Sequence, residues 1–233
     1  MAAKSNVGSR NPAGHPFARR RGWLFDLDGT LIDSSPGVIL AFHAAQQAFG
    51  EPPADPEAIR SRIGYPLVDT VRALSKVDYA QFIECFRREA LASMHLHSRL
   101  LPGARDLLDQ LANLGRLCAL VTSKRTDIAQ RIVDHLEIGH RFLAVIGSDA
   151  AADVKPHPAP LLEAARRLSL DKAQLVMVGD TQNDIQAARA AGLPVIALAS
   201  GHDTRERLDG ADLCFEDATE LLEFVRIAPG GTS

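Results

Sequence analysis

From residue 101 onward the chain alternates between short apolar runs and amphipathic segments with helical spacing. The apolar runs cover 117–121, 142–146, 175–178, 194–198 and 211–215, and a similar run at 22–26 precedes them. Short apolar runs of this kind are typical of strands that are buried on both faces. Strands separated by helices predict a parallel sheet covered on both sides. The sequence therefore predicts an α/β fold with a Rossmann-like parallel sheet.

Residues 34–99 interrupt this alternation. Their apolar spacing predicts helices over 37–49, 56–63, 67–74 and 79–97, with no strand signal. We therefore expect an all-α domain over 34–99, inserted into a discontinuous core domain formed by 22–33 and 100–228. The ends, 1–21 and 229–233, lack periodicity and are predicted to be flexible tails.

The composition is that of an ordinary globular protein, since the 233 residues are 46% hydrophobic and 24% charged. A net charge of −3 gives no reason to expect a nucleic-acid partner. No stretch approaches the roughly 20 apolar residues of a membrane helix, so we expect no membrane span. Three single cysteines without a CxxC pair favour reduced thiols and a cytoplasmic location. The pattern fits a monomer or a homodimer equally well.

The arginine run at 19–21 has two interpretations. A solvated basic tail is the expected one, because such runs at chain ends are usually exposed. A transit peptide is the alternative, whereas a secretory signal is excluded because Asp26 and Asp28 interrupt the apolar run that follows.

Polar side chains follow the predicted strands at the points where the strands end. Because the carboxyl ends of parallel strands meet at one edge of a sheet, we expect these side chains to converge. They are the carboxylates Asp26, Asp28, Asp180 and Asp184, the hydroxyls Thr122 and Ser123, and the cation Lys155. Oxygen ligands of this kind suit Mg²⁺, and a cation together with a hydroxyl suits a phosphate group.

Each of these residues also has a purely structural interpretation. The Asp28-Gly29 step is an ordinary turn sequence, and Thr122 or Ser123 can cap the next helix. Lys155 can be a solvated loop residue. Carboxylates, hydroxyls and a lysine that all end strands at one rim favour a common chemical site over independent structural uses.

In the motifs that contain these residues, the sequence resembles the haloacid dehalogenase superfamily of phosphatases, and the resemblance covers residues 22–228. Four motifs carry the resemblance, in this order: Asp26-Leu27-Asp28-Gly29-Thr30, Thr122-Ser123, Lys155-Pro156 and Gly179-Asp180-Thr181-Gln182-Asn183-Asp184. In that family the inserted helices form a cap, which implies the same for residues 34–99.

The resemblance implies a role for each residue of the rim. Asp26 resembles the nucleophile that becomes an aspartyl-phosphate, and Asp28 resembles the general acid and base. Thr122, Ser123 and Lys155 correspond to the phosphate-binding groups. The implied Mg²⁺ ligands are Asp26, Asp180 and the main-chain carbonyl of Asp28, with Asp184 orienting metal-bound waters.

The segment from Arg60 to Leu67 is similar to the specificity segment of the phosphoglycolate phosphatase-like members. Arg62 is then expected to contact a second anionic group of the substrate, with a surface arginine as the alternative. The retained Asp28 argues against dehalogenation. Val38 stands where mutase members of the family usually carry a histidine, which favours a hydrolase.

We therefore expect a Mg²⁺-dependent phosphatase that acts on a small phosphorylated metabolite similar to phosphoglycolate, with neither nucleic acid nor membrane as a partner. Two alternatives remain open at this point. One is a pyrophosphatase or a sugar-phosphate mutase on the same scaffold, and the other is a non-catalytic binding protein. The complete set of predicted catalytic residues argues against the binding protein, because binding alone needs no nucleophile.

Overall fold

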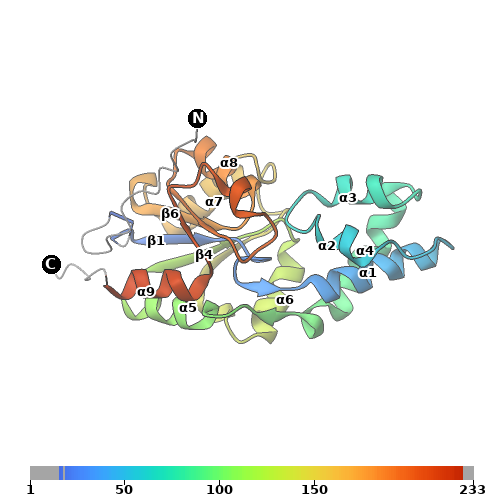
Figure 1. Ribbon diagram of the computed structural model, residues 1–233, viewed down its shortest axis with the longest axis horizontal. Helices are drawn as coiled ribbons and strands as arrows, with labels where there is room; N and C mark the ends of the chain where they lie inside the picture. Colours follow the sequence, from blue (N-terminus) through green and yellow to red (C-terminus); the bar gives the residue numbers. More distant parts are fainter. Residues whose placement is uncertain (1–15, 18, 228–233) are drawn as a thin grey trace.

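The computed structural model describes residues 16, 17 and 19–227 of the chain. Within them a six-stranded parallel sheet has the order β5-β4-β1-β6-β7-β8 (Figure 1). The strands are β1 (Gly22–Phe25), β4 (Leu117–Val121), β5 (Phe142–Ile146), β6 (Leu175–Gly179), β7 (Val195–Leu198) and β8 (Leu213–Phe215). The predicted parallel α/β fold is confirmed, and only the last strand is notably shorter than the apolar run that predicted it.

Helices cover both faces of the sheet. On the lower face in Figure 1 lie α5 (Ala104–Asn113), α6 (Thr126–His135) and α9 (Ala218–Ile227), and on the upper face lie α7 (Ala159–Leu168) and α8 (Gln182–Ala191). Short 3₁₀ helices precede three of the strands, at Gly139–Arg141, Lys172–Gln174 and Arg205–Leu208. The last helix runs two residues further than its predicted end at 225, and α8 begins two residues before its predicted start at 184.

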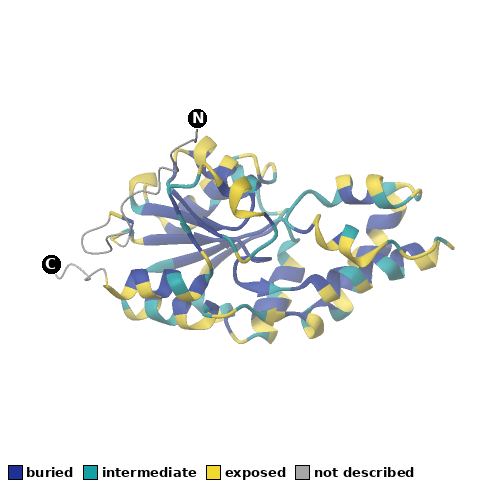
Figure 2. Cartoon of the chain, in the orientation of Figure 1, coloured by how far each residue is buried: buried dark blue, intermediate teal, exposed yellow. Residues whose placement is uncertain are grey.

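The strand side chains alternate between two hydrophobic clusters, one on each face. In β1, Trp23 and Phe25 belong to the cluster on the α5 and α9 side, whereas Leu24 belongs to the cluster on the α7 and α8 side. In β6, Val176 and Met177 divide in the same way. Because both faces are buried, the strands are apolar at every position, which is why their sequences form continuous runs (Figure 2).

The helical insertion lies to the right of the sheet in Figure 1. It contains α1 (Ser35–Ala48), α2 (Pro56–Arg60), α3 (Leu67–Leu74), α4 (Tyr79–Ser93) and a 3₁₀ helix at Met94–His97. The helices predicted over 56–63 and 79–97 therefore end early, at Arg60 and at Ser93. Aromatic packing joins α1 to α4, since the rings of Phe42 and Phe82 lie 4.7 Å apart. Both residues are continuous with the cluster under the sheet.

Both connections between the sheet and the insertion belong to a small antiparallel pair that the sequence pattern does not predict. Strand β2 (Ile32–Asp33) pairs with β3 (Arg99–Leu100). The Arg99 guanidinium lies 2.8 Å from the Asp33 carboxylate, and the Leu101 N–H donates to the Leu31 carbonyl over 3.0 Å. The insertion is therefore attached through two paired chain segments.

Cys85 and Cys118 are buried and Cys214 is half-buried, and all are free thiols. Burial raises the pKa of the Cys118 thiol to about 12. None of the helices among the described residues is long and apolar enough to cross a membrane. The predicted tails lie largely outside the described residues, although Phe17 packs into the cluster under the sheet.

Truncating Phe82 to alanine should destabilise the protein by about 3–5 kcal/mol, because the side chain is fully buried between α1 and α4. Leu91→Ala on the same helix is the matched control, since that side chain is 37% exposed and should cost about 1 kcal/mol or less. Urea denaturation of both variants measures the difference. Equal losses would show that the insertion is not held by this aromatic contact.

Candidate active site

The polar rim lies where the strand order reverses. From β1 the chain adds β4 and β5 on one side and β6, β7 and β8 on the other, which opens a crevice at the carboxyl ends of the central strands. Asp26 follows β1 directly, and its N–H donates to the Val178 carbonyl of β6 over 2.9 Å. Thr122 follows β4, and its N–H donates to the Ile146 carbonyl of β5 over 2.9 Å. The sheet therefore fixes the backbone of both residues.

Lys155 reaches into this crevice from the loop after β5 and is only 3% exposed. Its ammonium nitrogen lies 2.8 Å from Asp26 Oδ1 and 2.7 Å from Asp184 Oδ1, and it donates to the Val121 carbonyl over 3.0 Å. Burial by itself would lower the pKa of Lys155, but attraction to Asp184 and Asp26 raises it above its ordinary value. The lysine is therefore a fixed, buried positive charge rather than a solvated loop residue.

Three buried carboxylates lie together at this point, and two of them contact Lys155. Asp26, Asp180 and Asp184 each offer an oxygen atom, and these atoms all lie within 4.8 Å of one another. Burial raises the pKa of Asp26 to about 8, with Lys155 opposing that rise and the neighbouring carboxylates adding to it. Such a concentration of acidic groups favours the approach of a cation.

Asp180, at the end of β6, is held by two elements on either side of it. Its Oδ1 accepts from the Thr30 hydroxyl over 2.8 Å, and its Oδ2 accepts from the His202 N–H over 2.8 Å. The His202 ring nitrogen Nδ1 lies 3.0 Å from the same oxygen. A Cβ on Gly29 or on Gly201 would come within 2.1 Å of that Oδ2, so only glycine permits this close approach.

Burial and hydrogen bonding have opposite effects on the pKa values of Asp180 and His202. Burial raises the pKa of Asp180, with the hydrogen bond and charge of His202 working against it. For His202, burial lowers the pKa, but Asp180 outweighs that effect and the pKa is raised overall. A cation beside Asp180 would compete with the protonated imidazole, since both stabilise the same carboxylate.

Asp184 is placed by the first turn of α8. Its Oδ2 accepts from the N–H of Thr181 over 3.0 Å and from the Thr181 hydroxyl over 2.7 Å. The bond from the Thr181 N–H, together with the Asp184 N–H donating to the Thr181 side chain, forms a capping box at the start of the helix. Its Oδ1 contacts Lys155. Both oxygens are therefore already engaged by the chain.

Asp28 lies beside the cluster of Asp26, Asp180 and Asp184 and is not part of it. Its Oδ1 accepts a short hydrogen bond from the Ser34 hydroxyl, and its Oδ2 lies 2.9 Å from the Lys124 ammonium. Asp28 and Ser123 both line a cavity of about 330 Å³ between the sheet edge and the helical insertion. The carboxylate of Asp28 is thus not one of the clustered oxygens, which leaves its carbonyl as the ligand that the resemblance implies.

The other predicted residues take separate positions. Thr122 is buried, and its hydroxyl accepts from the Lys124 N–H over 3.2 Å, as in a turn or a helix cap. Arg62 follows α2, is exposed, and lines the same cavity as Asp28. The structure therefore brings Asp26, Lys155 and the two later aspartates together, whereas Arg62 lines the cavity and is not part of this cluster.

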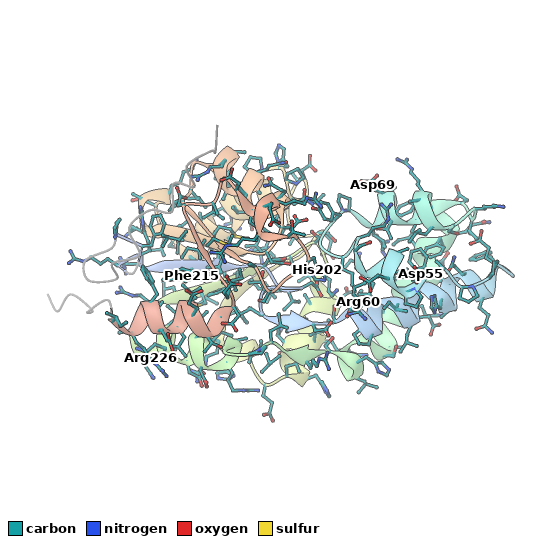
Figure 3. All side chains as sticks on the ribbon, viewed as in Figure 1. Asp55, Arg60, Asp69, His202, Phe215 and Arg226 are labelled. Atoms are coloured by element: carbon teal, nitrogen blue, oxygen red, sulfur yellow. The ribbon has the colours of Figure 1, made fainter. Side chains whose placement is uncertain are left out.

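Sequence reasoning missed four side chains that position the predicted ones: Thr30, Ser34, Lys124 and His202. Lys124 and His202 follow strands β4 and β7, so the strand-end argument that singled out Lys155 also applies to them. Figure 3 shows His202 where the sheet edge faces Arg60 of the insertion. Ser34 and Thr30 have no comparable signal, because a hydroxyl near a turn is common.

A second polar group joins the insertion to the loop after β7. The Tyr65 hydroxyl donates to Asp203 Oδ2 over 2.8 Å, and Arg207 lies 2.9 Å from the same carboxylate. The Gln182 N–H at the start of α8 also donates to Asp203, over 2.8 Å. Burial, reinforced by Asp203, raises the pKa of Tyr65 to about 12, so its hydroxyl remains a donor at neutral pH.

The donor set fits a divalent cation that prefers oxygen. Asp26, Asp180 and Asp184 each have a carboxylate oxygen in the buried group, and one oxygen of Asp184 also contacts Lys155. The group contains no thiolate, which favours Mg²⁺ or Mn²⁺ over the metals that soft ligands select.

Comparison with known protein families identifies the family to which this chain belongs. A family model described as haloacid dehalogenase-like hydrolase matches residues 23–198, which contain the acidic cluster and Lys155. The chain is 34% identical over 215 residues to a phosphoglycolate phosphatase from Chromobacterium violaceum, covering 87% of this chain and 95% of that protein. It is 32% identical over 241 residues to the phosphoglycolate phosphatase of Escherichia coli K12, covering 88% and 92%.

Solved structures are similar over the same length. A haloacid dehalogenase-like hydrolase from Streptococcus pneumoniae has a TM-score of 0.79 at 29% identity and covers 88% of this chain and 98% of its own. A predicted phosphoglycolate phosphatase from Haemophilus somnus has a TM-score of 0.76 at 28% identity, covering 88% and 97%. These matches confirm the resemblance that the four motifs indicate.

The close approach at Gly201 gives a test of the candidate metal site. Gly201→Ala should displace the Asp180 carboxylate and weaken Mn²⁺ binding about 10- to 100-fold, measured by calorimetry. Gly50→Ala is the control, because a Cβ there meets nothing within 4 Å, so any loss is confined to the strain of its positive φ. Unchanged Mn²⁺ affinity in a folded Gly201→Ala protein would place the cation away from Asp180.

Proposed function

We propose that this chain, a phosphatase that belongs to the haloacid dehalogenase-like hydrolase family, hydrolyses a small phosphorylated metabolite through an aspartyl-phosphate on Asp26. The observation that carries the proposal is the pairing of Asp26 with Lys155 at 2.8 Å inside a buried acidic cluster. Curated relatives at 32–34% identity are named phosphoglycolate phosphatases, which supports a substrate similar to phosphoglycolate.

Asp26 has the position that a nucleophile needs. Its backbone is held at the end of the central strand, so the carboxylate has little freedom to turn away from the crevice. Attack of its oxygen on phosphorus would form an acyl phosphate and release the alcohol. Lys155 would hold the attacking carboxylate and offset the charge of the phosphate, which is the main requirement of phosphoryl transfer.

Asp28 is the proposed proton carrier. It lines the cavity in which the alcohol would leave, and the hydroxyl of Ser34 and the ammonium of Lys124 fix both of its oxygens. From there it would protonate the leaving oxygen and later accept a proton from the water that hydrolyses the acyl phosphate. Ser34 and Lys124 act by orienting this carboxylate.

Asp26, Asp180 and the Asp28 carbonyl are the proposed ligands of a Mg²⁺ ion, with Asp184 behind them. When bound, the ion supplies positive charge that offsets the repulsion between the aspartate and a phosphate dianion. Thr30 and His202 hold Asp180 in position from both sides, and Thr181 and Lys155 do the same for Asp184.

We also propose that the helical insertion is a cap domain with the boundaries 34–99, and that it excludes water from the rim. The cavity between the insertion and the sheet edge supports this role. The hydrogen bond from Tyr65 to Asp203 would hold the insertion over the site. Asp203 also anchors the start of α8, so this contact and the acidic cluster share one helix terminus.

A sugar-phosphate mutase or a pyrophosphatase on the same scaffold is a weaker proposal. Val38 on α1 is only 8% exposed and lines the cavity, so the position of the mutase histidine is taken by an aliphatic side chain. A binding protein without activity would need neither a buried nucleophile nor an oriented Asp28.

Asp26→Asn should lower the hydrolysis rate on the order of 10⁴-fold or more while the fold stays intact, because the amide cannot form the acyl phosphate. The assay uses a panel of phosphate esters that includes 2-phosphoglycolate, sugar phosphates, nucleotides and pyrophosphate. Asp69→Asn, an exposed change on α3, should keep the activity of the unaltered protein. Substantial turnover by folded Asp26→Asn would refute the nucleophile, and no turnover of any ester by the unaltered protein would refute the phosphatase.

Removing divalent cations with excess chelator should stop hydrolysis, and adding back Mg²⁺ should restore it. The physical reason is that the buried carboxylates would repel a phosphate dianion without a cation. Circular dichroism before and after chelation separates loss of the ion from loss of the fold. Full activity in excess chelator would remove the proposed role of Mg²⁺.

A further inference from the structure

We propose that the alcohol half of the substrate has an apolar body and ends in a second anionic group, and is therefore larger than glycolate. This inference rests on the proposed phosphatase function. It keeps the second anion of a phosphoglycolate-like substrate and departs from it in the size and apolar character of the alcohol. It is carried by the cavity beside Asp28, whose size, wall chemistry and charge all differ from what a two-carbon acid requires.

The cavity begins where the phosphate site ends. Asp28, Ser123 and Lys124 form its boundary at the sheet edge, whereas Asp26 and Lys155 are not among its lining residues. From that boundary it extends between the insertion and α6. An ester whose phosphorus lies against Asp26 would thus place its alcohol in this space, beside the proposed proton donor.

The walls of the cavity are mainly apolar. They are formed by side chains of α1, α2, α4 and α6, each less than a tenth exposed: Val38, Phe42, Ile59, Ile83, Phe86 and Ile128. A sugar would bring several hydroxyl groups against these walls, and hydroxyls buried without partners are strongly unfavourable. A hydrocarbon or aromatic portion would instead gain from leaving water.

The volume also points to a larger ligand. The cavity holds about 330 Å³, within the range of about 300–1,000 Å³ that buries ligands of drug size. The glycolate part of 2-phosphoglycolate has two carbon atoms and would leave most of this space empty. An alcohol with an apolar body of six or more carbon atoms would occupy the cavity far better.

The charged side chains at the cavity show where the second anion would bind. Lys124 is paired with Asp28 at 2.9 Å, and Arg125 lies 3.2 Å from Asp127. Arg62 and Arg87 also line the cavity, and within the described part of the chain neither guanidinium has an ion-pair partner. Both belong to the insertion, so an anionic group bound there would be held by the insertion and not by the sheet edge.

A homologous series of esters tests this inference. The series runs from 2-phosphoglycolate to 4-phosphonooxybutanoate and 6-phosphonooxyhexanoate, with hexyl phosphate as the analogue that lacks the carboxylate. Affinity is measured by calorimetry on the Asp26→Asn protein in the presence of Mg²⁺, and kcat/KM is measured on the unaltered protein. Each added methylene should tighten binding about fourfold until the cavity is filled.

Two pairs of variants locate the effect. Val68→Trp fills the cavity from α3 and should weaken binding of the hexanoate ester more than that of 2-phosphoglycolate, whereas Asp69→Trp places the same side chain on the neighbouring exposed position. Arg62→Gln combined with Arg87→Gln should remove the advantage of the carboxylated ester over hexyl phosphate. Arg88→Gln is the control, because Arg88 pairs with Glu89 at 3.1 Å and does not line the cavity.

The outcomes separate this inference from the proposed function. Affinity that is flat or falls along the series, while 2-phosphoglycolate is hydrolysed, would overturn the inference and leave the phosphatase standing. Affinity that rises along the series, without turnover of any ester, would support the cavity assignment and refute the phosphatase. Equal effects of Val68→Trp and Asp69→Trp would also overturn the inference, since the ligand would then not occupy this cavity.

Discussion

The buried ion pairs of Lys155 determine the arrangement of the site. One ammonium group contacts the carboxylate that follows β1, the carboxylate that caps α8, and the last carbonyl of β4. A buried charge is tolerated only when its partners are well placed, because the loss of one partner leaves an uncompensated charge in a poorly polarisable interior. The three elements are therefore required to meet at one point, and the strand order that brings β4, β1 and β6 side by side satisfies this requirement.

The same arrangement accounts for the electrostatics of the rim. Lys155 balances part of the charge of Asp26 and Asp184, yet burial and the surrounding carboxylates still raise the pKa of Asp26 to about 8. The third carboxylate, Asp180, is paired with His202. The chain thus holds acidic oxygens together at a cost in free energy, which is a pattern that functional sites show more often than structural ones.

The sequence predicts the parts of the structure that follow from periodicity, but it does not predict those that depend on tertiary contacts. The apolar runs locate β4 and β5 to the residue, and the strand-end argument finds Asp26, Asp180 and Lys155. It does not find β2 and β3, because two-residue strands have no periodicity to detect. His202 and Lys124 also follow strands, but only the folded chain shows which carboxylates these side chains contact. The boundary of the cap domain stays a prediction.

In the proposed function, catalysis and substrate choice would depend on residues of different kinds. The rim uses polar groups at strand ends, which the motifs reveal. The cavity walls use residues such as Phe42 and Ile83, whose spacing along α1 and α4 is that of any amphipathic helix. These side chains belong to the same cluster as the core under the sheet, so a change that suits a new substrate also alters packing. If these walls contact the substrate as proposed, changes in substrate preference would be limited by the stability of the insertion, and the motifs at the rim would carry little information about that preference.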